Sequence, residues 1–169
     1  HAGIAEVIKY GLIIDREFYC WLLTNIEKVL KRDTEALIYI IEVSCRCKAT
    51  VVAEDEKEKG LRAILNLGHK FGHAIETAMG YGVCLHGEAV AIGMLLAARL
   101  SCQLGDLNDS DVLELTDLLK RCSLPIEIPP QMTSNQFIEL MMLDKKVQDH
   151  RLRLVLMKAI GQAYITDDV

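Results

Sequence analysis

Three of the five histidines fall in one short window, and this clustering is the strongest chemical signal in the sequence. His69 and His73 are four residues apart, and His86 follows in the sequence Leu85-His-Gly-Glu. Residues four apart lie on one face of a helix. Imidazole is the commonest metal ligand in proteins, so the window predicts a metal site, and spacing alone would include His73 among the ligands.

A run of polar residues leads into this window at helical spacing. Its members, separated by 4, 4, 3 and 4 residues, are Glu58, Arg62, Asn66, His69 and His73. If the segment is one helix, these residues form a stripe where an apolar face is usual, and the stripe needs a polar cavity to face. Gly60 and Gly68 leave open the alternative that the helix is broken and that the residues lie on loops.

Cations elsewhere in the chain are unremarkable when taken singly. Glu6 and Lys9 are three apart and so are neighbours on a helix face. A surface pair of this kind usually contributes less than about 1 kcal/mol. Lys48 and the Lys145-Lys146 pair carry no further signal by themselves.

These residues are set in a chain whose apolar residues recur mostly at helical spacing. We expect helices at about 2–13, 17–30, 34–53, 68–79, 88–104, 109–122 and 134–142. The tail alternates polar and apolar residues over 151–157 and has a second β-prone run at 163–166, which predicts a terminal β-hairpin. The fold class is therefore mostly α, in a single domain over residues 1–169.

Composition excludes several classes of protein. A formal charge of -5 and a pI near 5.5 give no general attraction for nucleic acid. The six cysteines show no CxxC pair, so we expect reduced thiols and a cytoplasmic protein. No apolar run is long enough to span a membrane, and no GxGxxG motif follows a strand. Because the chain opens at His1 within an amphipathic segment, we expect a piece of a longer polypeptide.

Taken together, these segments resemble the C-terminal domain of the 3-dehydroquinate synthase family. The resemblance covers essentially the whole chain, and its most specific parts are Leu61-Arg-Ala-Ile-Leu-Asn-Leu-Gly-His69, Phe71-Gly-His-Ala-Ile-Glu76 and Leu85-His-Gly-Glu-Ala-Val-Ala-Ile-Gly-Met94. It implies the multi-helix domain of that fold. It also separates the roles of the histidines, since the family pattern makes Glu6, His69 and His86 the ligands of Zn²⁺ or Co²⁺.

The resemblance assigns the other polar residues to catalysis and substrate binding. His73 and Glu58 resemble the proton-transfer pair. The substrate's carboxylate, hydroxyls and phosphate are expected to contact Lys9, Lys48, Arg62, Asn66 and one of Lys145 and Lys146. The implied reaction is that of a lyase in the shikimate pathway, in which NAD transiently oxidises a hydroxyl of 3-deoxy-arabino-heptulosonate 7-phosphate, phosphate leaves, and the ring of 3-dehydroquinate closes.

The family's NAD-binding N-terminal domain has no counterpart in these residues, so we expect that domain as a partner, a homodimer, and no activity from this chain alone. Another sugar phosphate cyclase on the same scaffold is the nearest alternative, but Arg62 and Asn66 favour a substrate with a carboxylate. An iron-type polyol dehydrogenase fits the segments at Glu6 and Lys145 less well. A noncatalytic helical domain that keeps its metal is the alternative from another class.

Overall fold

The computed structural model describes residues 2–55, 60–80, 83–143 and 152–167. In chain order its elements are α1 (Ala2–Ile13), α2 (Arg16–Leu30), α3 (Thr34–Glu54), the 3-10 helix η1 (Leu61–Asn66), α4 (His69–Met79), α5 (His86–Gln103), α6 (Asp109–Arg121), α7 (Ser134–Leu143), β1 (Leu154–Ala159) and β2 (Gln162–Thr166). The predicted mostly α chain with a terminal β-hairpin is confirmed. None of the helices described is long and apolar enough to cross a membrane.

The structure differs from the sequence prediction at two places that affect the site. Residues Leu61–Asn66 form a short 3-10 helix that the periodicity did not predict. Helix α5 begins at His86, two residues before the predicted start. It begins early because the Glu88 carboxylate accepts a hydrogen bond from the Leu85 N–H at 2.9 Å and so caps the first turn.

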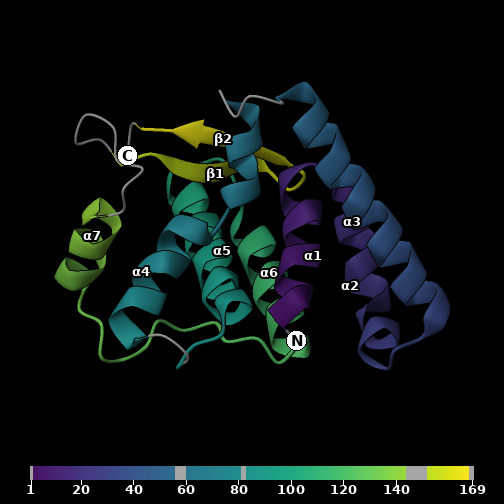
Figure 1. The fold of residues 1–169 in the computed structure, drawn as a ribbon, viewed down its shortest axis with the longest axis horizontal. Helices are drawn as coiled ribbons and strands as arrows, with labels where there is room; N and C mark the ends of the chain where they lie inside the picture. The colour runs from purple at the N-terminus through teal and green to yellow at the C-terminus, as the bar shows by residue number, and fades with distance from the viewer. Residues whose placement is uncertain (1, 56–59, 81–82, 144–151, 168–169) are drawn as a thin grey trace.

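Helix α5 lies at the centre of the fold (Figure 1), packed against α1, α4, α6 and β1. Every residue from 89 to 95 is buried. A helix that is apolar all round is stable only in the interior, and this one is rich in alanine and aliphatic side chains. It therefore serves as the support on which α1 and α4 are placed.

Two flanks complete the fold (Figure 1). Helices α2 and α3 cover α1 on one side, and α7 packs against α4 on the other. Aspartates set the starts of α2 and α3: Asp15 accepts from the Phe18 N–H and Asp33 from the Ala36 N–H, each at 2.9 Å. On the opposite flank, the rings of Phe71 and Phe137 stack with centroids 6.0 Å apart.

The terminal hairpin is tied to the helices at two points. Strands β1 and β2 pair antiparallel, and the turn uses Gly161 at a positive φ of 84°. The Gly161 N–H donates to the Leu12 carbonyl of α1 at 2.9 Å. The Met157 N–H donates to the Ser101 hydroxyl of α5 at 3.0 Å, so the hairpin closes over α1 and α5.

Candidate metal centre

The start of α4 is fixed against α5 by two glycines. Gly68, the residue directly before α4 and His69, has a φ of 78°, a conformation that strongly favours glycine. A Cβ on Gly93 of α5 would collide with the Gly68 backbone. This close approach fixes the position of His69 at the first residue of α4.

A second close approach brings α1 to the start of α5. A Cβ on Gly87 would overlap the backbone of Ala2 in α1. Glu6 follows Ala2 by about one helical turn, and His86 immediately precedes Gly87. The same contact therefore sets Glu6 opposite His86.

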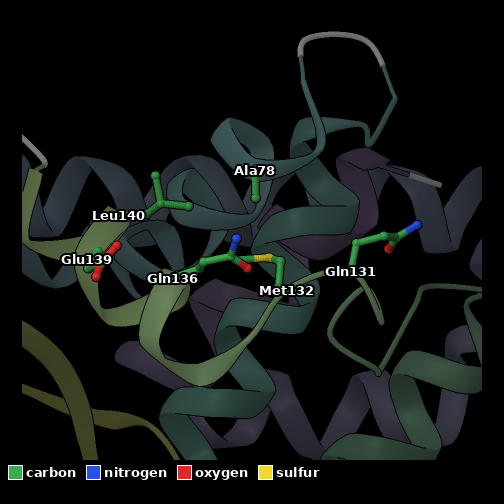
Figure 2. A pocket seen from close by; sticks show the side chains of 6 residues that line it. All are labelled: Ala78, Gln131, Met132, Gln136, Glu139 and Leu140. Atoms are coloured by element: carbon green, nitrogen blue, oxygen red, sulfur yellow. The ribbon is translucent and has the colours of Figure 1, made fainter.

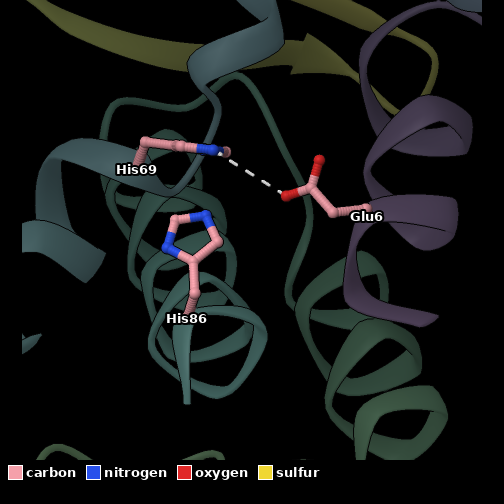
Figure 3. A group of neighbouring side chains, drawn as sticks. All are labelled: Glu6, His69 and His86. Atoms are coloured by element: carbon pink, nitrogen blue, oxygen red, sulfur yellow. Dashed lines mark ion pairs between the residues drawn. The ribbon is translucent and has the colours of Figure 1, made fainter. Parts of the chain in front are cut away.

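The three predicted metal ligands lie together (Figure 3). One side-chain ligand atom from each of Glu6, His69 and His86 lies within 4.8 Å of the others. They come from three different helices, α1, α4 and α5. Two imidazoles and one carboxylate are a usual set for catalytic zinc, and they leave a coordination position open.

The Glu6 carboxylate supports the fit of a cation. Its Oε1 atom is buried and has no hydrogen-bond partner among the described residues. It lies 3.8 Å from Nε2 of His69, beyond hydrogen-bond distance. Two ligands of one tetrahedral zinc would lie about 3.3 Å apart, so a small closure would satisfy both atoms through a shared ion.

His69 is held in the form that a metal requires. Its Nδ1 lies 3.2 Å from the Leu67 carbonyl oxygen, which can only accept, so Nδ1 carries the proton and the Nε2 lone pair faces Glu6. Burial, and next the nearby Lys9 ammonium, lower the pKa of His69 to about 4. The ring is therefore neutral near pH 7, as metal ligation demands.

Lys9 is the buried cation of this region. It is 3% exposed, and its ammonium pairs with the Glu6 carboxylate. Burial lowers the pKa of Lys9, Glu6 opposes this effect, and the charge of Lys48 lowers the pKa further. Lys48, on α3, is therefore close enough to Lys9 for the charges of these two predicted substrate-binding cations to interact.

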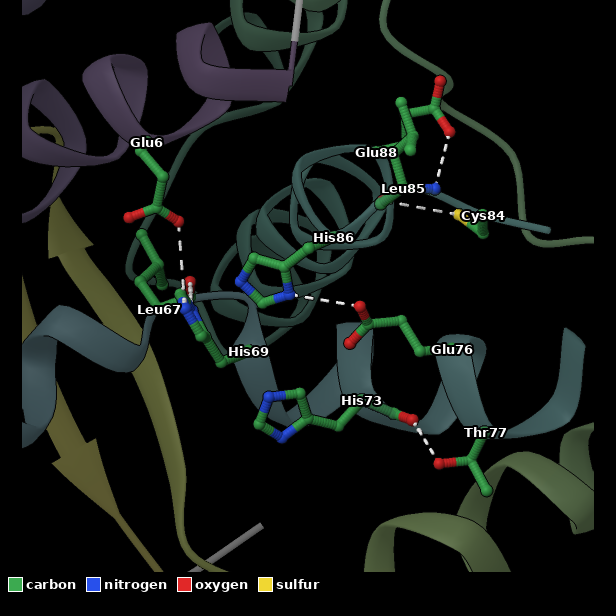
Figure 4. A network of polar contacts seen from close by, with 10 residues as sticks. All are labelled: Glu6, Leu67, His69, His73, Glu76, Thr77, Cys84, Leu85, His86 and Glu88. Atoms are coloured by element: carbon green, nitrogen blue, oxygen red, sulfur yellow. Dashed lines mark hydrogen bonds and ion pairs between the residues drawn. The ribbon is translucent and has the colours of Figure 1, made fainter. Parts of the chain in front are cut away.

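His73 lies beside the three predicted ligands but is not one of the close group. Its ring centroid is 5.9 Å from that of His69 and 6.2 Å from that of His86, and the residue is exposed. Figure 4 shows it following His69 along α4. A histidine one helical turn from the ligands is placed to exchange protons with a molecule held there.

The polar stripe is broken, as the two glycines had left open. Arg62 and Asn66 belong to η1, and both residues are partly exposed, whereas His69 and His73 belong to α4. Helix η1 packs against α1 and α3 and so stays next to the ligands. Three further predicted residues, Glu58, Lys145 and Lys146, lie outside the described residues.

One side chain at the site was quoted in the sequence motif without being given a role. Glu76 of α4 places Oε1 at 3.2 Å from Nδ1 of His86 (Figure 4). The available signal was its spacing, three residues after His73 and seven after His69, which puts it on the same helix face.

Pockets elsewhere do not contain these residues. A cavity of about 230 Å³ lies between α4 and α7 and is lined by Ala78, Gln131, Met132, Gln136, Glu139 and Leu140 (Figure 2). A second, of about 440 Å³, is mainly apolar and lies between α5, the proline-containing loop and α7. Neither pocket includes a predicted metal ligand or substrate-binding residue. The group of Glu6, His69 and His86 is therefore the candidate site.

Comparisons with known proteins identify the family of the chain. Residues 3–147 match the family model described as 3-dehydroquinate synthase C-terminal. The chain is 59% identical over 162 residues to a 3-dehydroquinate synthase of Methylococcus capsulatus, covering 96% of this chain and 45% of that protein. A 3-dehydroquinate synthase of Nitrosococcus oceani is 57% identical over 166 residues, covering 98% of this chain and 46% of the relative.

Solved structures show the same fold. A 2-epi-5-epi-valiolone synthase from Streptomyces hygroscopicus subsp. jinggangensis 5008, with NAD⁺ and Zn²⁺ bound, aligns with a TM-score of 0.89 at 25% identity, over 99% of this chain and 47% of that one. A 2-deoxy-scyllo-inosose synthase complexed with carbaglucose-6-phosphate, NAD⁺ and Co²⁺ gives a TM-score of 0.73 at 24% identity, over 98% and 46%. The second likeness concerns the fold alone.

The chain spans about half the length of the curated relatives it matches. The matched family model and the identity over nearly all of this chain nevertheless settle its family. The chain belongs to the 3-dehydroquinate synthase family, to the part of it that the C-terminal family model describes.

Proposed function

We propose that this chain is the metal-binding half of a 3-dehydroquinate synthase. The proposed reaction converts 3-deoxy-arabino-heptulosonate 7-phosphate to 3-dehydroquinate with elimination of phosphate, for aromatic amino-acid synthesis. The observation that carries the proposal is the group formed by Glu6, His69 and His86, in a chain 59% identical to a relative of that name.

The ion proposed for this group is Zn²⁺ or Co²⁺, both of which accept two imidazoles and a carboxylate. When bound, it would supply Lewis-acid polarisation of a substrate hydroxyl, while NAD would accept and return a hydride. A solved structure of the same fold supports this pairing, since the 2-epi-5-epi-valiolone synthase has NAD⁺ and Zn²⁺ bound.

The chain's own residues would bind the substrate and move its protons. Lys9 places positive charge beside Glu6, and the charge of Lys48 acts on Lys9, so both cations are proposed to bind a carboxylate or phosphate of the substrate. Arg62 and Asn66, on η1 next to α1, are proposed to contact its carboxylate and hydroxyls. One of Lys145 and Lys146 is proposed to reach the phosphate.

Proton transfer is proposed for His73, with Glu58 as its partner. His73 is exposed, and it lies within one helical turn of His69. Histidine is the side chain that enzymes use most often as a general acid or base. A carboxylate close to the ring would orient it and stabilise its protonated form.

We further propose that the chain forms a single metal- and substrate-binding domain whose partner is an NAD-binding N-terminal domain of the same protein. Coverage of only 45% to 47% of the relatives' lengths supports a missing half. A homodimer and a cytoplasmic location are part of the same proposal. The six free cysteines suit a reducing compartment.

The test is to fuse the chain behind the N-terminal half of the Methylococcus capsulatus relative and to measure phosphate release from the heptulosonate phosphate with NAD⁺ and Zn²⁺. We expect NAD-dependent turnover that His73→Ala reduces by about 100-fold or more. A correctly folded, metal-loaded fusion that releases no phosphate from this substrate would refute the proposal.

A second candidate, another sugar phosphate cyclase, is favoured by the likeness to the 2-epi-5-epi-valiolone synthase. The same fusion distinguishes the two when it is offered a sugar phosphate without a carboxylate, such as glucose 6-phosphate. Turnover of that substrate alone would favour the second candidate. Metal binding without turnover of either substrate would indicate a noncatalytic metal domain.

A further inference from the structure

We infer that Glu76 is a positioning residue for the metal centre, which it serves by fixing the ring orientation and tautomer of His86. The inference rests on the proposed function, because it takes His86 to be a ligand. It adds to the three-ligand set a fourth side chain that does not touch the ion.

His86 needs such support because packing does little to hold it. The imidazole is 51% exposed, whereas that of His69 is 17% exposed. As the first residue of α5, His86 also has no preceding helical turn to restrict its side chain. A ring in this position rotates unless a polar partner fixes it, and rotation would point a different atom at the metal.

Glu76 provides that partner. Its Oε1 lies 3.2 Å from Nδ1 of His86, and a carboxylate can only accept, so the proton must reside on Nδ1. Nε2 then carries the lone pair, and Figure 4 shows this nitrogen pointing toward Glu6 and His69. Free histidine has no such constraint on which nitrogen is protonated, and metal ligation requires the unprotonated one.

The two predicted histidine ligands are therefore both oriented by a hydrogen bond from Nδ1, but the acceptors differ. His69 donates from Nδ1 to the Leu67 carbonyl at 3.2 Å, and His86 donates from Nδ1 to Glu76 at the same distance. A backbone carbonyl suits the ring that packing already holds. The exposed ring has a carboxylate instead, which is the stronger acceptor and makes the imidazole a better donor to the metal.

The charge of Glu76 adds to its orienting effect. The carboxylate of Glu6 is paired with the Lys9 ammonium, and this pairing offsets its negative charge before the ion arrives. The Glu76 side chain is 24% exposed, and its charge would help to compensate a dication bound by His86. We therefore expect glutamine at this position to support binding less well than glutamate.

The fold holds Glu76 at the required distance. A Cβ on Gly72 would meet Ala89 and Val90 backbone atoms at 3.1 to 3.2 Å, so α4 lies tightly against the first turn of α5. Glu76 is one turn beyond Gly72 on α4, and His86 is one turn before Ala89 and Val90 on α5. The pair is thus set by backbone packing between two helices.

The experiment measures Zn²⁺ affinity in the whole 169-residue chain, its Glu76→Gln and Glu76→Ala variants, and a matched control, Glu88→Gln. Glu88 lies two residues from His86, and its contact is with the Leu85 N–H, which a glutamine oxygen still accepts. We expect a loss of affinity of about 10-fold to 100-fold for Glu76→Ala, a smaller loss for Glu76→Gln, and none for Glu88→Gln.

A second readout needs no metal. Long-range ¹H–¹⁵N NMR of the His86 ring should show the Nδ1–H tautomer in the unmodified chain and in Glu76→Gln, whose amide oxygen still accepts. It should show a shift toward Nε2–H in Glu76→Ala. A merely structural contribution of Glu76 to folding would leave this tautomer balance unchanged.

Equal Zn²⁺ affinity in all four proteins, or the same tautomer with and without Glu76, would overturn the inference. Failure of the proposed metal site gives a different result, because the unmodified chain would then bind no Zn²⁺ while the tautomer shift on Glu76→Ala would persist. In that event Glu76 still orients His86, but for a purpose other than metal binding.

Discussion

Substitution by alanine should have opposite effects on stability at two serines that differ in their hydrogen bonds. Ser101 of α5 is fully buried; its hydroxyl donates to the Ala97 carbonyl at 2.8 Å and accepts the Met157 N–H at 3.0 Å. Ser44 of α3 also has a buried hydroxyl oxygen, but that oxygen has no hydrogen-bond partner among the described residues. Alanine at each position therefore removes a bonded hydroxyl in one case and an unpaired one in the other.

The magnitudes follow from these contacts. Ser101→Ala leaves the buried N–H of Met157 without an acceptor, which costs about 1 to 3 kcal/mol. Alanine is the better helix former by about 0.5 kcal/mol, so the net loss of stability is about 0.5 to 2.5 kcal/mol. Ser44→Ala gains the same helix propensity and loses no bond, so it should stabilise the chain by about 0.5 kcal/mol or more.

Urea unfolding followed by circular dichroism measures both variants against the unmodified chain. For a domain of this size, 1 kcal/mol corresponds to about 2–4 °C in Tm, so thermal unfolding gives a second readout. Helix propensity cancels in the comparison of the two variants. Equal free energies of unfolding for Ser101→Ala and Ser44→Ala would refute the reasoning that the Ser101 bond ties the hairpin to the central helix.

Three further predictions concern the site and the whole protein. First, burial lowers the pKa of His69 from 6.5 to about 4, so between pH 6.5 and about pH 4 the His69 ring is protonated in the unfolded chain but not in the folded one. The metal-free chain should therefore lose up to about 3 kcal/mol as pH falls through this window, and none from this residue above it. Urea unfolding at several pH values tests this, and a pH dependence as shallow as that of His69→Gln would contradict it. Second, Lys9→Met should raise the pKa of His69, because the Lys9 ammonium is among the causes that lower it; an unchanged or lower value in an NMR titration would count against the assignment. Third, these 169 residues alone should release no phosphate from the heptulosonate phosphate with NAD⁺ and metal, and turnover at the rate of a full-length relative would show that no second domain is needed.

Much of the fold could be predicted because its helices carry strong local signals. The bounds of α1 were predicted at both ends, and the predicted starts of the next two helices lie within one residue of those observed. Helix η1 was missed, since a 3-10 helix of six residues is too short to show an apolar period. The start of α5 was placed two residues late because Gly87 is a poor helix former.

The sequence predicted the residue types of the site better than the contacts that bring them together. Spacing within one segment relates His69 to His73, but the placement of α1 and of the start of α4 against α5 depends on backbone contacts at Gly87 and Gly93 that no periodicity encodes. Only the family pattern separated the ligand His69 from its neighbour on the same face. The contact of Glu76 with His86 joins two helices, so its distance became visible only in three dimensions.

The most direct test of the metal centre is a Zn²⁺ titration of the purified chain, with metal content measured alongside, for Glu6→Ala, His69→Ala and His86→Ala. His73→Ala is the matched control, since its ring lies beside the cluster but outside the close group. We predict one Zn²⁺ per chain, lost in each of the three ligand variants and retained in the control. Undiminished binding in any ligand variant, or loss in His73→Ala equal to that in His69→Ala, would contradict the assignment of Glu6, His69 and His86 as the metal ligands.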